Sequence, residues 1–259
     1  MVYRNQLSQI YKNMKYLLIL LFSSVTSVAQ IQKIPHQNKT KDQNYELTYI
    51  ISMDKEGFLD KIKTSNQRDK KSSSYLIKSL NQSFPVKFKI IVNSNNAYSF
   101  RPAKLKRDDL NINLNNLIFR SETQYYLNFE SQNYIFKKDL SGKKYFVDFK
   151  PKKYKIDSQK TKLINGYNCY LARLKSNEIL EIWFTTDIPL SVGPLKYFGL
   201  PGVVVQAKIS NFTYINLKSI KLTPETIKKL PKTAEVISQE EYKEITKKLA
   251  VSLFEDANN

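Results

Sequence analysis

Short runs of alternating apolar and polar residues, rich in aromatic and β-branched side chains, recur through most of this chain. Several follow one another at intervals of about 8–12 residues with turn-forming residues between them, which predicts a large antiparallel sheet, either an open barrel or sandwich-like. The expected strands are 45–53, 86–92, 97–100, 124–129, 133–137, 144–149, 153–157, 167–174, 178–185, 202–209 and 212–222.

The last part of the chain changes to a helical pattern. Ser238 and Glu241 have the spacing of a capping box, in which each side chain bonds a free amide at the start of a helix. The apolar residues that follow share one helical face. We therefore expect a helix over about 239–256, packed on the sheet, and a fold of the α+β class that is mainly β.

Three further segments have weaker patterns. Residues 74–82 predict a short helix that stops before Pro85. Residues 54–73 and 101–120 read as loops. Thr223, followed by Pro224, predicts the start of a helix that ends by Leu230, because a proline comes next.

The amino terminus has the pattern of an export signal. Lys15 precedes the apolar run 16–22, and the small residues Ser27 and Ala29 predict cleavage between Ala29 and Gln30. This run is too short to cross a bilayer, which takes about 20 residues. Translation can start at Met1 or at Met14, the latter being a normal start for such a signal.

The predicted organisation has three parts. Residues 1–29 are an extended amino terminus with a signal peptide, 30–44 are a polar, flexible lead-in, and 45–259 form a single domain. No other segment is apolar enough to span a membrane, so we expect no transmembrane span after cleavage.

The net charge of +19 raises the question of a polyanionic partner. Most of the positive charge is lysine scattered along the chain, whereas arginine, the preferred residue for bidentate phosphate contacts, occurs at six positions. We therefore expect a solvated lysine surface that can face an anionic envelope surface, and no nucleic-acid partner.

The segment 193–202 combines tight turns with aromatic residues. Pro201 and Gly202 suit the second and third positions of a type II turn, the third of which requires a positive φ. The turns at its two ends bracket Leu195, Tyr197 and Phe198. This pattern predicts a compact loop packed around its aromatic side chains.

The stretch Gly199-Leu200-Pro201-Gly202-Val203-Val204 resembles the signature of the GLPGLI family of exported Bacteroidetes proteins. Upstream, Phe146-Val147-Asp148, the segment from Lys162 to Cys169, Ile182-Trp183-Phe184-Thr185 and Asp187-Ile188-Pro189 resemble further family elements in order. The resemblance covers about 145–222. It implies a periplasmic, outer-membrane-associated or secreted protein, and it implies no established activity.

Residue types that carry chemistry are sparse. His36 is the only histidine and Cys169 the only cysteine, so a zinc or nucleophilic site has no ligand set and we predict no metal or cofactor. We expect Cys169 to be a small buried hydrophobe on a strand. Glu178 and Glu181 fall on opposite faces of one strand, and Asp187 is expected to bond a turn backbone.

These observations favour a non-catalytic binding or interaction module, with an outer-membrane protein partner or an apolar ligand. The alternatives are a carboxylate-based hydrolase, an apolar-ligand carrier with Trp183 as a cavity wall, and a structural scaffold. The candidate binding or motif residues are Trp183, Asp187, Pro189, Gly193, Pro194, Tyr197, Phe198, Gly199, Leu200, Pro201 and Gly202.

Overall fold

The computed structural model describes residues 43–64, 70–81, 83–102, 124–140, 142–210 and 212–256. The strands are β1 (Tyr45–Met53), β2 (Val86–Val92), β3 (Asn96–Phe100), β4 (Gln124–Asn128), β5 (Asn133–Leu140), β6 (Lys143–Asp148), β7 (Tyr154–Ile164), β8 (Tyr167–Leu174), β9 (Asn177–Thr185), β10 (Val203–Ser210), β11 (Thr213–Leu222) and β12 (Val236–Ile237). The helices are α2 (Lys55–Thr64), α3 (Lys70–Asn81) and α5 (Gln239–Asp256).

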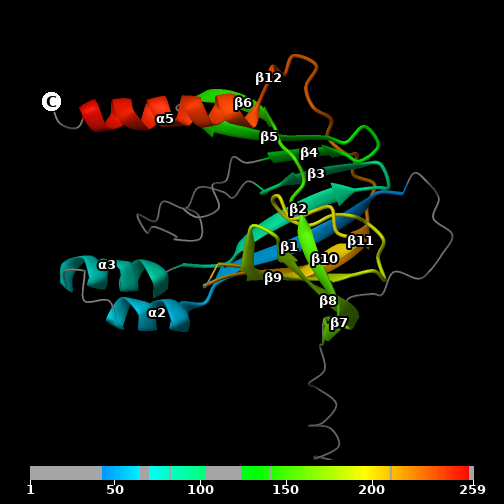
Figure 1. Cartoon of the computed structure of the whole chain (residues 1–259), viewed down its shortest axis with the longest axis horizontal. Coiled ribbons are helices and arrows are strands. Elements are labelled where there is room, and N and C mark those ends of the chain that lie inside the picture. Colours follow the sequence, from blue (N-terminus) through cyan, green and yellow to red (C-terminus); the bar gives the residue numbers. More distant parts are fainter. Residues whose placement is uncertain are drawn as a thin grey trace, which may run out of the picture. The chain divides into compact units, whose positions relative to one another are not determined.

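The described strands form one twelve-stranded sheet in the order β12-β6-β5-β4-β3-β2-β1-β11-β10-β9-β8-β7 (Figure 1). Neighbouring strands pair antiparallel except β12, which runs parallel to β6. The prediction of a large, β-rich sheet is confirmed, but the sheet is mixed and does not close on itself. The short parallel strand arises because the chain returns from β11, in the middle of the sheet, to the β6 edge before it enters α5.

Strand alternation accounts for the core. In β8, Tyr167, Cys169 and Leu171 are buried while Asn168 between them is exposed, as expected where one face of a strand is covered. Asn165 and Gly166 both have positive φ and make the two-residue turn between β7 and β8. The strand predicted at 153–157 is longer in the structure. It corresponds to β7, which continues to Ile164 after an irregularity in its pairing between Asp157 and Thr161.

The prediction of a long loop over 54–73 is wrong. Asp54 caps α2, because its side-chain Oδ1 accepts the backbone N–H of Gly57 at 3.1 Å. Phe58 of α2 packs edge-on against Phe212, with 5.4 Å between ring centroids. Tertiary packing and a cap thus stabilise a helix whose sequence is largely charged. The predicted short helix is confirmed as α3, and the predicted loop at 101–120 lies outside the described residues from 103 onward.

The predicted helix at 223–230 is also wrong. The hydroxyl of Thr223 accepts the N–H of Glu225 at 3.2 Å, as a helix cap would, but residues 223–231 have no regular structure. A helix this short gains too few hydrogen bonds to offset nucleation. Asn44 Nδ2 instead donates to the Glu225 carbonyl oxygen at 2.9 Å and ties this segment, here named the strap, to the start of β1.

The carboxy-terminal helix matches its prediction. The Glu241 N–H donates to Ser238 Oγ at 3.1 Å, so the predicted cap is present. Tyr242 lies edge-on to Phe136 of β5 and Tyr145 of β6, with centroids 5.7 and 6.0 Å away, which packs the first turn of α5 on the sheet. None of the described helices contains a stretch apolar and long enough to cross a membrane.

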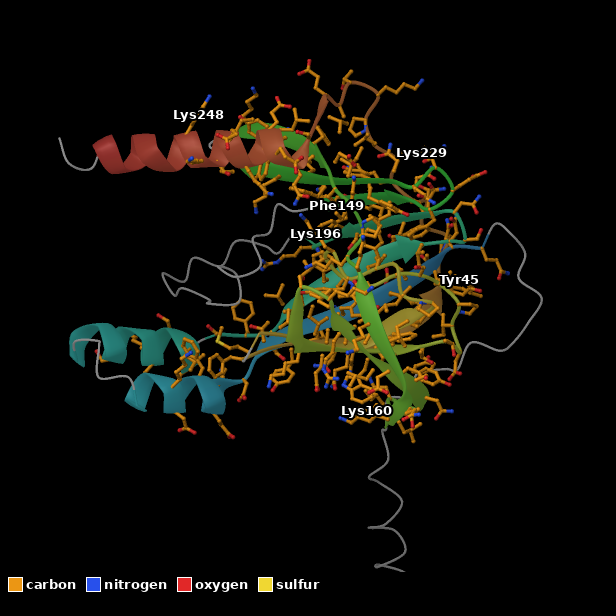
Figure 2. The ribbon with its side chains drawn as sticks, in the orientation of Figure 1. Tyr45, Phe149, Lys160, Lys196, Lys229 and Lys248 are labelled. Atoms are coloured by element: carbon orange, nitrogen blue, oxygen red, sulfur yellow. The ribbon has the colours of Figure 1, made fainter. Side chains whose placement is uncertain are left out.

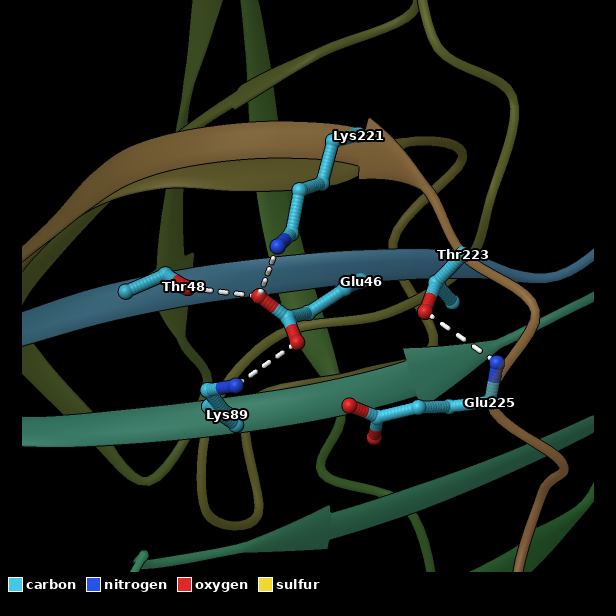
Figure 3. Close-up of polar contacts among 6 residues, drawn as sticks. All are labelled: Glu46, Thr48, Lys89, Lys221, Thr223 and Glu225. Atoms are coloured by element: carbon cyan, nitrogen blue, oxygen red, sulfur yellow. Dashed lines mark hydrogen bonds and ion pairs between the residues drawn. The ribbon is translucent and has the colours of Figure 1, made fainter.

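A buried carboxylate links three strands near the middle of the sheet (Figure 3). Glu46 of β1 is 3% exposed, and its carboxylate lies 2.7 Å from Lys89 Nζ of β2 and 3.2 Å from Lys221 Nζ of β11. Burial by itself raises the pKa of Glu46, but the hydrogen bonds and charges of the two lysines outweigh burial, and the net pKa lies below its ordinary value.

Glu46→Gln should show what this pair of contacts contributes. A carboxylate whose pKa is lowered by folding adds stability above the ordinary value of 4.5, and this stability is lost as the pH falls through the folded value. We expect the variant to lose about 1–3 kcal/mol in free energy of unfolding at pH 7, and the difference from the wild type to disappear below the folded pKa. Urea unfolding between pH 7 and pH 3 measures this.

Glu181→Gln is the matched control. Its partner Arg173 lies 2.9 Å away, but the Glu181 side chain is 40% exposed, against 4% for Glu46, so this change should cost less than about 1 kcal/mol. Equal losses for both variants, or a Glu46→Gln deficit that persists at low pH, would contradict the assignment.

Candidate functional site

The signature loop, defined as residues 193–202, packs on the sheet. Phe198 is 1% exposed, and its ring centroid lies 4.9 Å from that of Tyr134 and 5.6 Å from that of Phe149. Tyr197 and Leu200 are buried as well. These side chains join the loop to β5 and to the end of β6, so they belong to the core.

The glycines of the signature loop act differently from the prediction. Gly202 does not have the positive φ that a type II turn requires at its third position; Gly199 and, unusually, Leu195 do. At Gly202 a β-carbon would overlap the backbone carbonyl of Thr185, and at Gly193 one would overlap the Tyr197 carbonyl oxygen. Close approach of backbones, and not turn type, therefore requires glycine at both positions.

The other predicted site residues lie around this packed loop. Pro194 is buried, whereas Pro189, Gly199 and Pro201 are exposed. Trp183 is half-buried on β9, with Lys162 Nζ 5.8 Å from its ring centroid. The structure thus brings the loop residues together as a packing unit.

The surroundings of Asp187 and Cys169 indicate structural roles for both residues. In the turn after β9, the N–H of Asp187 donates to Thr185 Oγ1 at 3.2 Å, and its exposed carboxylate makes no hydrogen bond to a described residue, unlike the predicted turn contact. Cys169 is fully buried on β8, as predicted. Burial, with the charge of Asp187 adding to it, raises the pKa of the Cys169 thiol to about 12, so the thiol stays protonated at neutral pH.

A cavity of about 540 Å³ lies where the strap passes the ends of the neighbouring strands. Tyr126 and Ile135 lie side by side in the β4–β5 pair and line it. Five asparagines, which successive strands bring into one row, line the cavity and define what is here named the asparagine pocket. They are Asn44, Asn93, Asn96, Asn128 and Asn133.

Strand register accounts for the row of asparagines. Asn44 and Asn93 flank the paired ends of β1 and β2, while Asn96 pairs with Asn128 and Asn128 with Asn133. Side chains of directly paired residues point to the same face of a sheet. In the sequence, each of these asparagines stands at a strand end, where asparagine is common because it favours turns. The sequence pattern therefore indicated turns at these positions and gave no sign that the asparagines share a pocket.

Two of the five amides hold the pocket together. Asn93 Oδ1 accepts the N–H groups of Asn95 and Asn96, at 3.0 and 2.8 Å, which closes the β2–β3 turn. Its Nδ2 donates to Asn44 Oδ1 at 3.1 Å, and Asn44 in turn donates to the strap at Glu225. This chain of hydrogen bonds fixes the strap against the sheet.

The remaining amides have hydrogen-bonding capacity to spare. Asn128 Oδ1 accepts the N–H of Ser131 at 2.8 Å, which leaves its Nδ2 without a described partner. The side-chain amides of Asn96 and Asn133 make no hydrogen bond within the described part of the chain. Each amide carries two donor hydrogens and an acceptor oxygen. The pocket therefore presents several unused donors and acceptors.

Aromatic and cationic groups border the same pocket. The Tyr126 ring lies 5.2 Å from the Tyr98 ring, centroid to centroid, and Lys228 Nζ of the strap lies 5.8 Å from the Tyr98 centroid. Burial raises the pKa of Tyr126 and, with the charge of Tyr126 adding to it, the pKa of Tyr98 to about 12. Both phenols are thus neutral. Tyr126 lines the pocket, and its hydroxyl donates to Gln124 Oε1 at 3.0 Å.

The lining of the pocket determines what it can do chemically. It contains asparagine, threonine, tyrosine, lysine and apolar side chains, and neither Asp nor Glu among the described residues. No group of three or more His, Cys, Asp or Glu residues suited to a metal occurs in the part of the chain that the structure describes. The asparagine pocket is therefore equipped for hydrogen bonding to a polar ligand.

Comparison with known proteins gives one family-level match. Residues 121–206 match the model of a family described as a protein of unknown function (Porph_ging). The match covers less than half of the chain and includes the signature loop. No curated protein matches the sequence.

Three solved structures share limited similarity with the chain. Structures of PNGF-II in the C2 and P21 space groups are each 17% identical, with TM-scores of 0.45 and 0.48, over 76% and 79% of this chain and 31% and 33% of the PNGF-II chain. The chain thus spans about a third of the PNGF-II chains. An uncharacterized conserved protein from Thermus thermophilus is 8% identical with a TM-score of 0.33, over 76% of this chain and 90% of that one. These likenesses assign no activity.

Gly202→Ala should test the close approach of the signature loop to β9. Because the new methyl group would overlap the Thr185 carbonyl, we expect a loss of about 3 kcal/mol or more in free energy of unfolding. Urea unfolding followed by circular dichroism measures it. Gly166→Ala is the control: that glycine has φ +78° and no heavy atom near the added carbon, so about 1–2 kcal/mol is expected. Similar losses at both positions would show that close approach is not the constraint.

Proposed function

We propose that the chain is an exported envelope protein of the GLPGLI type that binds an uncharged, hydroxyl-rich ligand, an oligosaccharide, in the asparagine pocket without transforming it. The row of five asparagines in that pocket is the observation that carries the proposal. The pocket volume of about 540 Å³ lies within the range of small-ligand sites.

The chemistry of the amides favours hydroxyl groups as partners. A hydroxyl group both donates and accepts a hydrogen bond, and a carboxamide offers both functions on neighbouring atoms. Asn96 and Asn133 carry amides with no described partner, so a ligand would gain hydrogen bonds there without displacing protein contacts. Asparagine is uncharged and gives no advantage to an ionic ligand over a neutral one. Lys228 and Lys229 of the strap also line the pocket, and their ammonium groups can donate hydrogen bonds to hydroxyl oxygens.

The aromatic wall suits the same ligand class. Tyr126 lines the pocket with a largely buried ring, and a sugar ring has an apolar C–H face that packs on an aromatic ring as other apolar surfaces do. The combination of a ring face and neighbouring amides thus matches the two-sided character of a sugar. A polar lining supports an apolar-ligand carrier less well.

Export and family membership belong to the same proposal. The apolar run 16–22 followed by Ala29 supports cleavage of a signal peptide and a place in the periplasm, at the outer membrane or outside the cell. The family match over residues 121–206 supports a relationship to proteins of unknown function, and the GLPGLI assignment rests on the motifs between 145 and 222.

Binding to a panel of immobilised neutral oligosaccharides tests the proposal. The exported protein should bind some members, and titration calorimetry with the best binder should give a dissociation constant that Asn96→Ala and Asn133→Ala each weaken by about 3–10-fold. That loss corresponds to about one hydrogen bond per amide.

Asn168→Ala provides a control of the same residue type on the exposed face of β8, outside the pocket. It should leave the dissociation constant unchanged. Absence of binding across the panel, or equal weakening by Asn168→Ala, would refute the proposed ligand class.

A further inference from the structure

Lys196 of the signature loop lies over aromatic rings on the face of the sheet opposite to the asparagine pocket. Lys196 Nζ is 4.0 Å from the ring centroid of Phe136 and 5.0 Å from that of Phe149. Figure 2 labels Lys196 and Phe149. Leu195, just before Lys196, has a φ of +59°, a conformation uncommon for a residue other than glycine. The loop thus has a strained backbone next to a lysine that lies on the rings of Phe136 and Phe149, here named the apolar floor.

A second lysine stands close to the first. Lys152 Nζ lies 5.1 Å from the ring centroid of Tyr197, and its charge acts on Lys196. Neither ammonium group has an ion pair with a described residue. Two neighbouring cations without a carboxylate repel one another, and the aromatic rings beneath them offset part of that cost.

The titratable groups that face this floor are phenols. Tyr125 of β4, Tyr134 of β5 and Tyr242 of α5 contact the rings of Phe136 or Phe149, and burial raises the pKa of Tyr125 and of Tyr134. No carboxylate of the described residues contributes to the environment of Lys196. Burial and the charge of Lys152 therefore disfavour the ammonium form of Lys196, and the neutral phenols on these elements supply no negative charge to counter them.

This environment suits a reactive amine. Burial, with the charge of Lys152 adding to it, lowers the pKa of Lys196 to about 8. A lysine that is desolvated and lies beside another cation has a larger share of the neutral, nucleophilic form at neutral pH. Lysines used as imine-forming nucleophiles are activated in this way.

We propose that Lys196 is a nucleophilic amine that forms an imine with a small 2-oxo acid whose carboxylate pairs with Lys152. The nitrogen lone pair attacks the keto carbon, the nitrogen loses its protons, and the carbonyl oxygen leaves as water. The product is a C=N bond, and nothing is oxidised or reduced. Lys152 stays protonated and supplies the charge that the carboxylate needs.

This site is separate from the asparagine pocket. Tyr125 and Phe136 belong to the face that the signature loop covers, while Tyr126 and Ile135, their neighbours in sequence, line the pocket on the other face. Neither proposal depends on the other, and loss of the pocket amides should leave the reactivity of Lys196 unchanged.

Reductive trapping tests this directly. The full exported protein is incubated with pyruvate and sodium cyanoborohydride, and the adduct is located by peptide mass spectrometry. We expect one adduct at Lys196, formed several-fold faster than at any other lysine, with a rate that rises through about pH 8. Lys196→Arg keeps a cation over the rings and should abolish the adduct, whereas Lys150→Arg, at a neighbouring exposed lysine, should not.

The role of Lys152 has its own readout. Lys152→Gln should slow trapping by pyruvate several-fold at pH 7.4 and move the pH profile upward, while trapping by uncharged propanal should slow less, because only pyruvate has a carboxylate to pair. Thermal unfolding confirms that each variant is folded. Adducts spread evenly over the surface lysines, or a Lys152→Gln profile identical to the wild type, would overturn the proposal.

Discussion

One long-range pairing joins the two halves of the sheet. β1 pairs along its whole length with β11, Tyr45 opposite Leu222 and Met53 opposite Thr213, while its other edge pairs with β2. Without the β1–β11 contact, strands β1 to β6 with β12, and strands β7 to β11, would be two separate sheets. Glu46 bonds a lysine on each neighbouring strand, and the buried Tyr49 hydroxyl donates to the Val204 carbonyl of β10 at 2.8 Å. The Glu46 contacts reinforce the joint near the start of β1, and the Tyr49 contact adds a link from the middle of β1 to β10.

The same few strands serve two sites because side chains alternate along them. On one face of β4 and β5, the signature loop buries Phe198 against Tyr134 and holds Lys196 over Phe136. On the other face, Tyr126 and the asparagine row face the strap. A loop packed tightly on the first face limits how far these strands can move, so it helps to fix the second face as well.

Local patterns were enough wherever local chemistry decides the structure. The ranges of β1, β2, β8 and α5 agree with the sequence predictions, because strand alternation and the Ser238 cap act within a few residues. Local patterns failed where contacts between residues far apart in the chain decide the structure. The strap begins with a helix-like cap at Thr223 but stays irregular, and α2 forms in a charged segment because Asp54 caps it and Phe58 finds Phe212.

Periodicity and turn residues were sufficient to predict a β-rich chain with a carboxy-terminal helix and a turn-rich signature loop. Three features depend on the folded arrangement instead. Gly202 is needed for space beside Thr185, Asn96, Asn128 and Asn133 meet in one pocket, and Lys196 lies beside Lys152 over aromatic rings. Each of these depends on which strands become neighbours and in what register. That choice is made by contacts between residues far apart in the chain, which no local pattern records.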